Sequence, residues 1–175
     1  MPIVPYRGVE PRIAPGVFVA PNAWVIGDVT VGEDCSFWFN AVVRGDVHSI
    51  RIGARTNVQD SAILHVSHKT HDLRIGDDVV IGHGAVLHGC VIHDGALIGI
   101  GARVLDGATV ESSAQVGAGA LVSPGSRIPA GTLALGIPAK PARELRAEES
   151  ANIRAIAERY AGLKGTYGKE EWLRA

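Results

Sequence analysis

The chain has few cysteines, few aromatic residues and no excess of charge of either sign. Its 175 residues include 2 cysteines and 5% aromatic residues, and the formal net charge is −1 at pH 7. A near-neutral chain lacks the electrostatic footprint of a protein that binds nucleic acid or an anionic membrane. No apolar run approaches the roughly 20 residues of a membrane span, and Met1-Pro2-Ile3 does not open a signal peptide. We therefore expect a cytoplasmic protein with no nucleic-acid and no membrane partner, whose cysteines are buried free thiols rather than a disulfide.

Small and aliphatic residues are abundant, and they follow a hexapeptide rhythm. Glycine accounts for 22 residues, and an apolar residue recurs every six positions over 13–132, with interruptions. The recurring residues are Ile13, Val19, Val25, Val31, Phe37, Val43, Ile52, Val58, Leu64, Ile75, Ile81, Leu87, Ile92, Ile98, Val104, Val110, Val116, Val122 and Ile128. A short fixed period is typical of a parallel β-helix, because one unit buries its apolar side only when its neighbours stack on it. The sequence therefore predicts an all-β solenoid, a parallel β-helix of hexapeptide repeats, and the repeat resembles that of left-handed hexapeptide helices.

The interruptions divide the chain. His48-Ser49-Ile50 is a small insertion, and the polar segment 67–73 is expected to leave the solenoid as a loop. From Ala142 the pattern becomes helical, with apolar residues that can share one face. We predict a β-helix over 1–140 and a C-terminal helical segment over 141–175 that packs on the solenoid.

The period also predicts which side chains stack. Three hexapeptides form one coil of such a helix, so residues three repeats apart lie about 4.8 Å from each other in neighbouring coils. With the polar loop excluded from the count, this rule places Arg44, His65 and His88 in one outward column. It places Asp60 and His83 in a second column, on the neighbouring face.

Three outward histidines in this arrangement suit a divalent metal ion. Imidazole nitrogens bind zinc at about 2.0–2.1 Å, and catalytic zinc sites have three protein ligands and an open fourth position. Because His65 and His88 share one face and His83 lies on another, we expect two copies related by a three-fold axis to complete the site. The alternative is that all three are ordinary surface histidines. Polar residues in similar outward slots favour the metal site: Arg44, Asp46, Asn57, Gln59 and Asp60.

A family resemblance supports this interpretation. The chain resembles the gamma-class carbonic anhydrases in order, spacing and residue type over essentially the whole solenoid, at Arg44-Gly45-Asp46, Asn57-Val58-Gln59-Asp60, His65, Gly82-His83 and Leu87-His88-Gly89-Cys90. The resemblance implies a homotrimer with a metal ion at each subunit interface, held by His65 and His88 of one chain and His83 of the next. Zn²⁺ is the expected ion, with Fe²⁺ and Co²⁺ as alternatives.

The same resemblance implies a reaction and roles for the polar residues. Zinc lowers the pKa of its bound water from about 15.7 to about 7, and the hydroxide converts CO2 reversibly to bicarbonate. Gln59 would hydrogen-bond the metal-bound water or hydroxide, and Asn57 would orient Gln59. Arg44, Asp46 and Asp60 would form ion pairs at the interface and around the ligands.

The chain departs from the family pattern at the proton shuttle. Val47-His48-Ser49 stands where the founding pattern has an acidic loop, and His68 replaces a second expected glutamate. His68 could shuttle protons, since an unperturbed histidine has a pKa of about 6.5, or it could be an ordinary loop histidine. We therefore expect slow turnover.

Other functions and residues remain open from the sequence. Hexapeptide-repeat acyltransferases share the period and the Gly136-Ile137-Pro138-Ala139-Lys140 segment, so an acyltransferase, an acyl-CoA thioesterase or a non-catalytic scaffold subunit is an alternative. On the C-terminal helix, Asn152 and Tyr160 either approach the metal pocket or serve helix packing. Trp38 is expected at a subunit contact.

Overall fold

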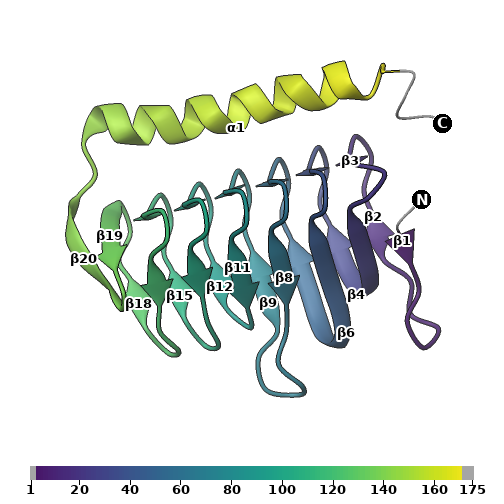
Figure 1. Ribbon diagram of the computed structural model, residues 1–175, viewed down its shortest axis with the longest axis horizontal. Coiled ribbons are helices and arrows are strands. Elements are labelled where there is room, and N and C mark those ends of the chain that lie inside the picture. The colour runs from purple at the N-terminus through teal and green to yellow at the C-terminus, as the bar shows by residue number, and fades with distance from the viewer. Residues whose placement is uncertain (1–2, 171–175) are drawn as a thin grey trace.

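The computed structural model describes residues 3–170. Within this range the chain forms a solenoid of 20 β-strands followed by one α-helix, which lies alongside the solenoid for much of its length (Figure 1). The solenoid is a parallel β-helix that matches the left-handed class, as the hexapeptide rhythm predicts. No helix in the described part of the chain is long and apolar enough to cross a membrane.

Two of the three faces of the solenoid belong to one 12-stranded sheet. They are joined because β4 (Trp24–Val31) and β6 (Val42–Ile52) continue from one face to the next. One of these faces carries His65 and His88 and is called here the histidine face. It contains the first halves of β4 and β6 together with β1 (Ile3–Val4), β8 (Ile63–His65), β11 (Val86–His88), β14 (Arg103–Val104) and β17 (Leu121–Val122). The second face contains their second halves with β2 (Arg12–Ile13), β9 (Leu73–Ile75), β12 (Val91–Ile92), β15 (Thr109–Val110) and β18 (Arg127–Ile128).

An 8-stranded sheet forms the remaining face, called here the helix face. Its strands are β3 (Phe18–Val19), β5 (Ser36–Phe37), β7 (Asn57–Val58), β10 (Val80–Ile81), β13 (Leu97–Ile98), β16 (Gln115–Val116), β19 (Thr132–Gly136) and β20 (Ala139–Glu144). The helix α1 (Ala147–Tyr167) packs on this face, against β5, β7 and β10. Ile153 of α1 is buried there against Val80 and Leu97.

The observed register is the one that the period predicts. Leu87 pairs with Leu64, and Ile81 pairs with Val58, so residues three repeats apart stack in adjacent coils. Every predicted repeat residue from Val25 to Ile128 is buried and forms the core. The stacking of an apolar column inside the coil therefore fixes which side chains point outward.

The two cysteines are buried free thiols, as predicted. Burial raises the pKa of Cys35 to about 11, against a smaller opposing effect of a backbone hydrogen bond. Burial also raises the pKa of Cys90. Both side chains are therefore protonated and unreactive at neutral pH.

The loop prediction is confirmed for residues 67–72, whereas Leu73 is buried and begins β9. The predicted start of the helix is wrong. The segment between β8 and β9 projects away from the solenoid (Figure 1). The helix begins at Ala147 rather than near Ala142, because Ala139–Glu144 forms β20 and pairs antiparallel with β19. This hairpin covers the edge of the last coil, where unpaired backbone groups would otherwise be exposed.

Candidate metal centre

Two of the candidate histidines lie side by side on the histidine face. His65 ends β8 and His88 ends β11, and the parallel register places them directly opposite each other. His65 Nδ1 lies 3.1 Å from His88 Nε2. Both rings are partly exposed, with side-chain exposures of 18% and 33%. The stacked column predicted from the sequence is therefore present.

The other nitrogen of each ring is held by a carboxylate. Asp46 Oδ1 lies 3.0 Å from His65 Nε2, and Asp106 Oδ1 lies 2.6 Å from His88 Nδ1. Asp46 also forms an ion pair with Arg44. Each ring is therefore held in place by the aspartate at one nitrogen, and its other nitrogen faces the second histidine.

The third candidate, His83, follows β10 at the corner between the helix face and the histidine face. It stacks on Asp60, since the Gly84 amide donates to the Asp60 carbonyl at 2.9 Å. His83 Nδ1 also lies 2.8 Å from Asp60 Oδ2. His83 Nε2 lies 3.3 Å from the Tyr160 hydroxyl of α1. Tyr160 therefore contacts a candidate metal ligand and also helps to pack the helix on the solenoid through Trp38. Asn152 is exposed on the same helix.

The structure does not bring the three histidines together within one chain. Among residues 3–170, no three His, Cys, Asp or Glu side chains are grouped so that they could hold a metal ion. His65 and His88 supply two nitrogens on one face, and His83 supplies a third at a separate corner.

The carboxylates of Asp46 and Asp106, which contact the paired histidines, are ionised at neutral pH. Burial tends to raise the pKa of Asp46, but hydrogen bonds from His65 and Arg44 outweigh it and hold the pKa below its usual value. Burial likewise tends to raise the pKa of Asp106, and hydrogen bonds from Ser67 and His88 lower it overall. A cavity of about 280 Å³ beside the N-terminal segment opens onto Asp46.

Asn57 and Gln59 lie on the helix face and are buried, at 2% and 5% exposure. The Gln59 side-chain amide donates to Asn57 Oδ1 at 3.1 Å, and Asn57 Nδ2 lies 3.5 Å from the Val79 carbonyl. The bond to Asn57 fixes the Gln59 amide plane, so its carbonyl oxygen is left to accept a hydrogen bond from another group.

His68 lies in the projecting loop and is exposed. It has no hydrogen-bond or ion-pair partner among the described residues. The ring is therefore open to solvent, and the role of His68 as a proton shuttle stays a prediction.

The expected subunit contact of Trp38 is wrong. Trp38 is only 4% exposed, and it packs edge-on against Tyr160 and Tyr167 of α1, with ring centroids 5.2 Å apart in both pairs. A large aromatic side chain that points outward from the coil is expected to be covered by another surface. Here that surface is the helix α1 of the same chain.

An ion pair links the last turns of α1 to the first coils, in addition to the aromatic contacts of Tyr167. Lys164 Nζ lies 2.6 Å from Asp34 Oδ1 and also donates to the Gly16 carbonyl at 2.9 Å. The hydrogen bond from Lys164 and its charge lower the pKa of Asp34. Because the pKa of Asp34 is lower in the folded protein, the ion pair contributes to stability above the unfolded pKa of about 4. This stabilisation is lost as the pH falls through the folded pKa.

Lys164→Met is therefore expected to loosen the end of α1 at neutral pH. Amide protection factors in its last two turns should fall at pH 7, and the difference from the unmodified protein should vanish in acid below the folded pKa of Asp34. Hydrogen–deuterium exchange with mass spectrometry measures this, with Lys169→Met as the control. Equal protection in both variants at pH 7 would show that the ion pair does not hold the helix.

Sequence reasoning missed two residues of the site, Ser67 and Asp106. Ser67 Oγ donates to Asp106 Oδ2 at 2.6 Å, and the other oxygen of Asp106 binds His88. The stacking rule contained the signal for Asp106, because Val104 stacks on Leu87 and Asp106 follows two residues later. The contact runs diagonally between coils, and the rule considered only vertical neighbours.

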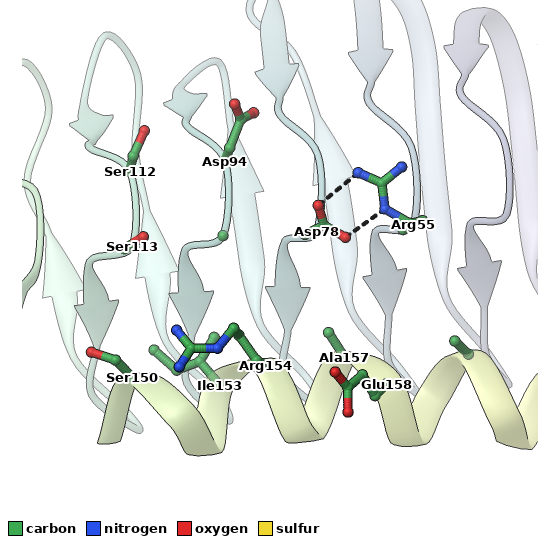
Figure 2. A pocket seen from close by; sticks show the side chains of 12 residues that line it. Arg55, Asp78, Asp94, Ser112, Ser113, Ser150, Ile153, Arg154, Ala157 and Glu158 are labelled. Carbon is green, nitrogen blue, oxygen red and sulfur yellow. Dashed lines mark hydrogen bonds and ion pairs between the residues drawn. The ribbon is translucent and has the colours of Figure 1, made fainter. Parts of the chain in front are cut away.

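A cavity of about 650 Å³ lies between α1 and the opposite corner of the helix face. Figure 2 shows Arg55 there, bound to Asp78 by two hydrogen bonds of 2.7 Å. Asp94 and Ser112 of the solenoid and Arg154 of the helix also line it. None of the candidate metal or catalytic residues lines this cavity, so it is separate from the histidine site.

The fold and the paired histidines define a hexapeptide-repeat β-helix protein, and comparisons with known proteins narrow the class. No protein-family model matches the chain. A probable carbonic anhydrase of Methanocaldococcus jannaschii is 53% identical over 154 residues, which cover 88% of this chain and 96% of the relative. A carbonic anhydrase of Geobacillus kaustophilus is 47% identical over 167 residues, covering 95% and 91%.

A solved structure shares the whole architecture. A putative acetyltransferase of Bacillus cereus superposes with a TM-score of 0.92 at 47% identity, covering 94% of this chain and 95% of that one. The chain belongs to the gamma carbonic anhydrase-like family of hexapeptide-repeat proteins.

Proposed function

We propose that this protein binds one divalent metal ion at each contact between copies of itself and hydrates CO2 reversibly to bicarbonate there. One observation carries the proposal. Each of the three histidines has one ring nitrogen in contact with an aspartate, and within residues 3–170 none of the other three nitrogens is bound to a carboxylate. A carboxylate behind a histidine is typical of metal ligands, because it fixes the tautomer and the ring orientation and makes the ligand more basic.

The donor set fits such an ion. Two nitrogens that each lie about 2.0–2.1 Å from one zinc ion can be at most about 4.2 Å apart. His65 Nδ1 and His88 Nε2 are 3.1 Å apart, within that limit. His83 Nε2 of a neighbouring copy would be the third ligand. Three imidazoles suit Zn²⁺, and Fe²⁺ or Co²⁺ as alternatives.

Apolar side chains beside both histidine positions support the contact between copies. On the histidine face, Trp24 and Ile63 are 46% and 44% exposed, in the column next to His65 and His88. At the His83 corner, the next coil carries Ile100, which is 60% exposed. A contact between two different faces is heterologous, and rotation closes such contacts into a ring. A ring of three copies agrees with the family resemblance.

The residues around the ligands have distinct tasks. When bound, the ion supplies an electrophile that lowers the pKa of coordinated water to about 7, so a nucleophile is available at neutral pH. Asp46, Asp60 and Asp106 accept N–H bonds from the histidines and keep the opposite nitrogens free of protons. Arg44 offsets the charge of Asp46. The fixed carbonyl of Gln59 accepts a hydrogen bond from the attacking water and so orients it toward CO2.

The proton released by the reaction must reach solvent, and the segment directly after Asp46, Val47-His48-Ser49, contains no acidic residue that could carry it. CO2 hydration should therefore be measurable but limited by proton transfer. Added imidazole buffer should raise kcat and leave kcat/KM nearly unchanged. If His68 carries the proton, His68→Ala should make kcat more dependent on buffer, whereas His93→Ala on the second face should not. Stopped-flow assays over a range of buffer concentrations measure both effects, and identical curves for the two variants would remove His68 from the mechanism.

Acyl-CoA chemistry is the second candidate, favoured by the likeness to the Bacillus cereus protein described as a putative acetyltransferase. The same metal-loaded preparation should be assayed with CO2 and with acyl-CoA thioesters. Hydrolysis of thioesters without CO2 hydration at any buffer concentration would replace the carbonic anhydrase proposal. Absence of both activities in a metal-replete assembly would favour a scaffold role.

A further inference from the structure

The projecting loop is connected to His88 through the carboxylate of Asp106. Ser67, its first residue, donates a 2.6 Å hydrogen bond to Asp106 Oδ2. The other oxygen of the same carboxylate, Oδ1, lies 2.6 Å from His88 Nδ1. One carboxylate therefore joins the loop to a candidate metal ligand, although Ser67 and Asp106 are far apart in the sequence.

The loop backbone is folded back on itself, which fixes the position of Ser67. The Ser67 amide donates to the His71 carbonyl at 3.0 Å, and the two residues form an isolated antiparallel bridge. The His71 side chain lies against the solenoid at Gly107. A Cβ added at Gly107 would be only 3.2 Å from His71 Nε2. The loop thus leaves the solenoid and returns against it beside Asp106.

The corner itself is built to admit the Asp106 carboxylate. Gly89 follows His88 with φ +52°, and a Cβ added there would lie 2.5 Å from Asp106 Oδ1 and 2.7 Å from the Cβ of His71. Any larger residue at this position would push the carboxylate and the loop away from His88. The pair His88-Gly89 therefore combines a ligand with the space that its carboxylate needs.

We propose that Ser67 and Asp106 are positioning residues for His88, and that loop 67–72 serves to hold Asp106 in place. Asp106 accepts the Nδ1–H of His88, which keeps the lone pair on Nε2, the nitrogen that faces His65. Ser67 restrains the second oxygen of Asp106, as Arg44 restrains that of Asp46 behind His65. The consequence for metal binding rests on the proposed function, whereas the effect on the His88 ring does not.

Two measurements on the full-length protein test this. Long-range ¹H–¹⁵N NMR of the metal-free protein reports the His88 tautomer, and titration with Co²⁺ alone, followed by visible absorption, gives its affinity. Asp106→Asn should shift His88 away from a pure Nδ1–H tautomer and weaken Co²⁺ binding by roughly 10- to 100-fold. Ser67→Ala should weaken it by roughly 2- to 10-fold, because it removes one hydrogen bond to the carboxylate that orients His88. Asp72→Asn, which alters a loop carboxylate bound to Arg74 instead, should change neither.

Each outcome decides the proposal. An unchanged His88 tautomer in folded Asp106→Asn, or equal Co²⁺ affinities for Ser67→Ala and Asp72→Asn, would overturn it. If Asp106→Asn does not fold, Ser67→Ala, which removes one hydroxyl at a partly buried position, carries the test. If the unmodified protein binds no Co²⁺, the metal proposal fails, and the tautomer measurement still decides whether Asp106 and Ser67 position His88.

Discussion

Replacing His88 by alanine is expected to abolish metal binding, from about one ion per chain to almost none. His88 Nε2 lies 3.1 Å from His65 Nδ1, and without it each contact between copies keeps only two imidazole ligands. CO2 hydration should fall at least about 100-fold, because the electrophile that activates water is lost. Elemental analysis of anaerobically purified protein and stopped-flow assays measure the two effects.

His83→Ala should have the same consequence, although His83 lies at a different corner of the solenoid from the paired histidines. His93→Ala is the matched control, because His93 is an exposed histidine whose nearest acidic partner is Glu111, 3.9 Å away on the second face. Full metal occupancy in both His83→Ala and His88→Ala would contradict the assignment of the ligands.

Two inactive variants should restore each other when they are mixed in one assembly. A His83→Ala chain still offers His65 and His88, and a His88→Ala chain still offers His83. If contacts between copies form at random from an equal mixture, about one contact in four pairs an intact histidine face with an intact His83 corner. Co-expression with two different affinity tags, followed by tandem purification and subunit-composition analysis, should therefore give about a quarter of the normal metal content and activity, after correction for the selected composition.

A mixture of His65→Ala and His88→Ala chains is the control. Both variants damage the same face, so every contact lacks one of the two paired ligands and no activity should return. Recovery in this control, or no recovery in the first mixture, would show that the site is not shared between chains as proposed.

The register of the solenoid could be predicted because a fixed period converts sequence distance into position. Once the loop was left out of the count, the stacking of His65 on His88 and of Asp60 on His83 followed from the position of their apolar neighbours. Few folds allow this, because in most of them the register between distant strands depends on loops of unknown shape. The same rule, extended to diagonal neighbours in adjacent coils, also predicts the contact of Asp106 with His88.

Contacts of the C-terminal helix could not be predicted in this way. The period does not determine how α1 lies on the solenoid. The sequence therefore predicts a subunit contact for Trp38, whereas Tyr160 and Tyr167 of the same chain cover it. The contact of Tyr160 with His83 depends on the same docking. The start of the helix was misplaced because the antiparallel pairing of Ala139–Glu144 with β19 is a tertiary interaction that overrides local helical propensity.

The central claim is that histidines from two copies of the chain share one metal ion, and native mass spectrometry of the metal-loaded protein tests it most directly. The mass gives the number of chains, and the increment over the metal-free mass gives the number of ions in the same particle. We predict a particle of three chains with three ions for the unmodified protein. For His88→Ala we predict a particle without ions, of three chains if assembly does not require metal. A single chain that carries an ion, or a three-chain particle that takes up none after incubation with Zn²⁺ or Co²⁺, would contradict it.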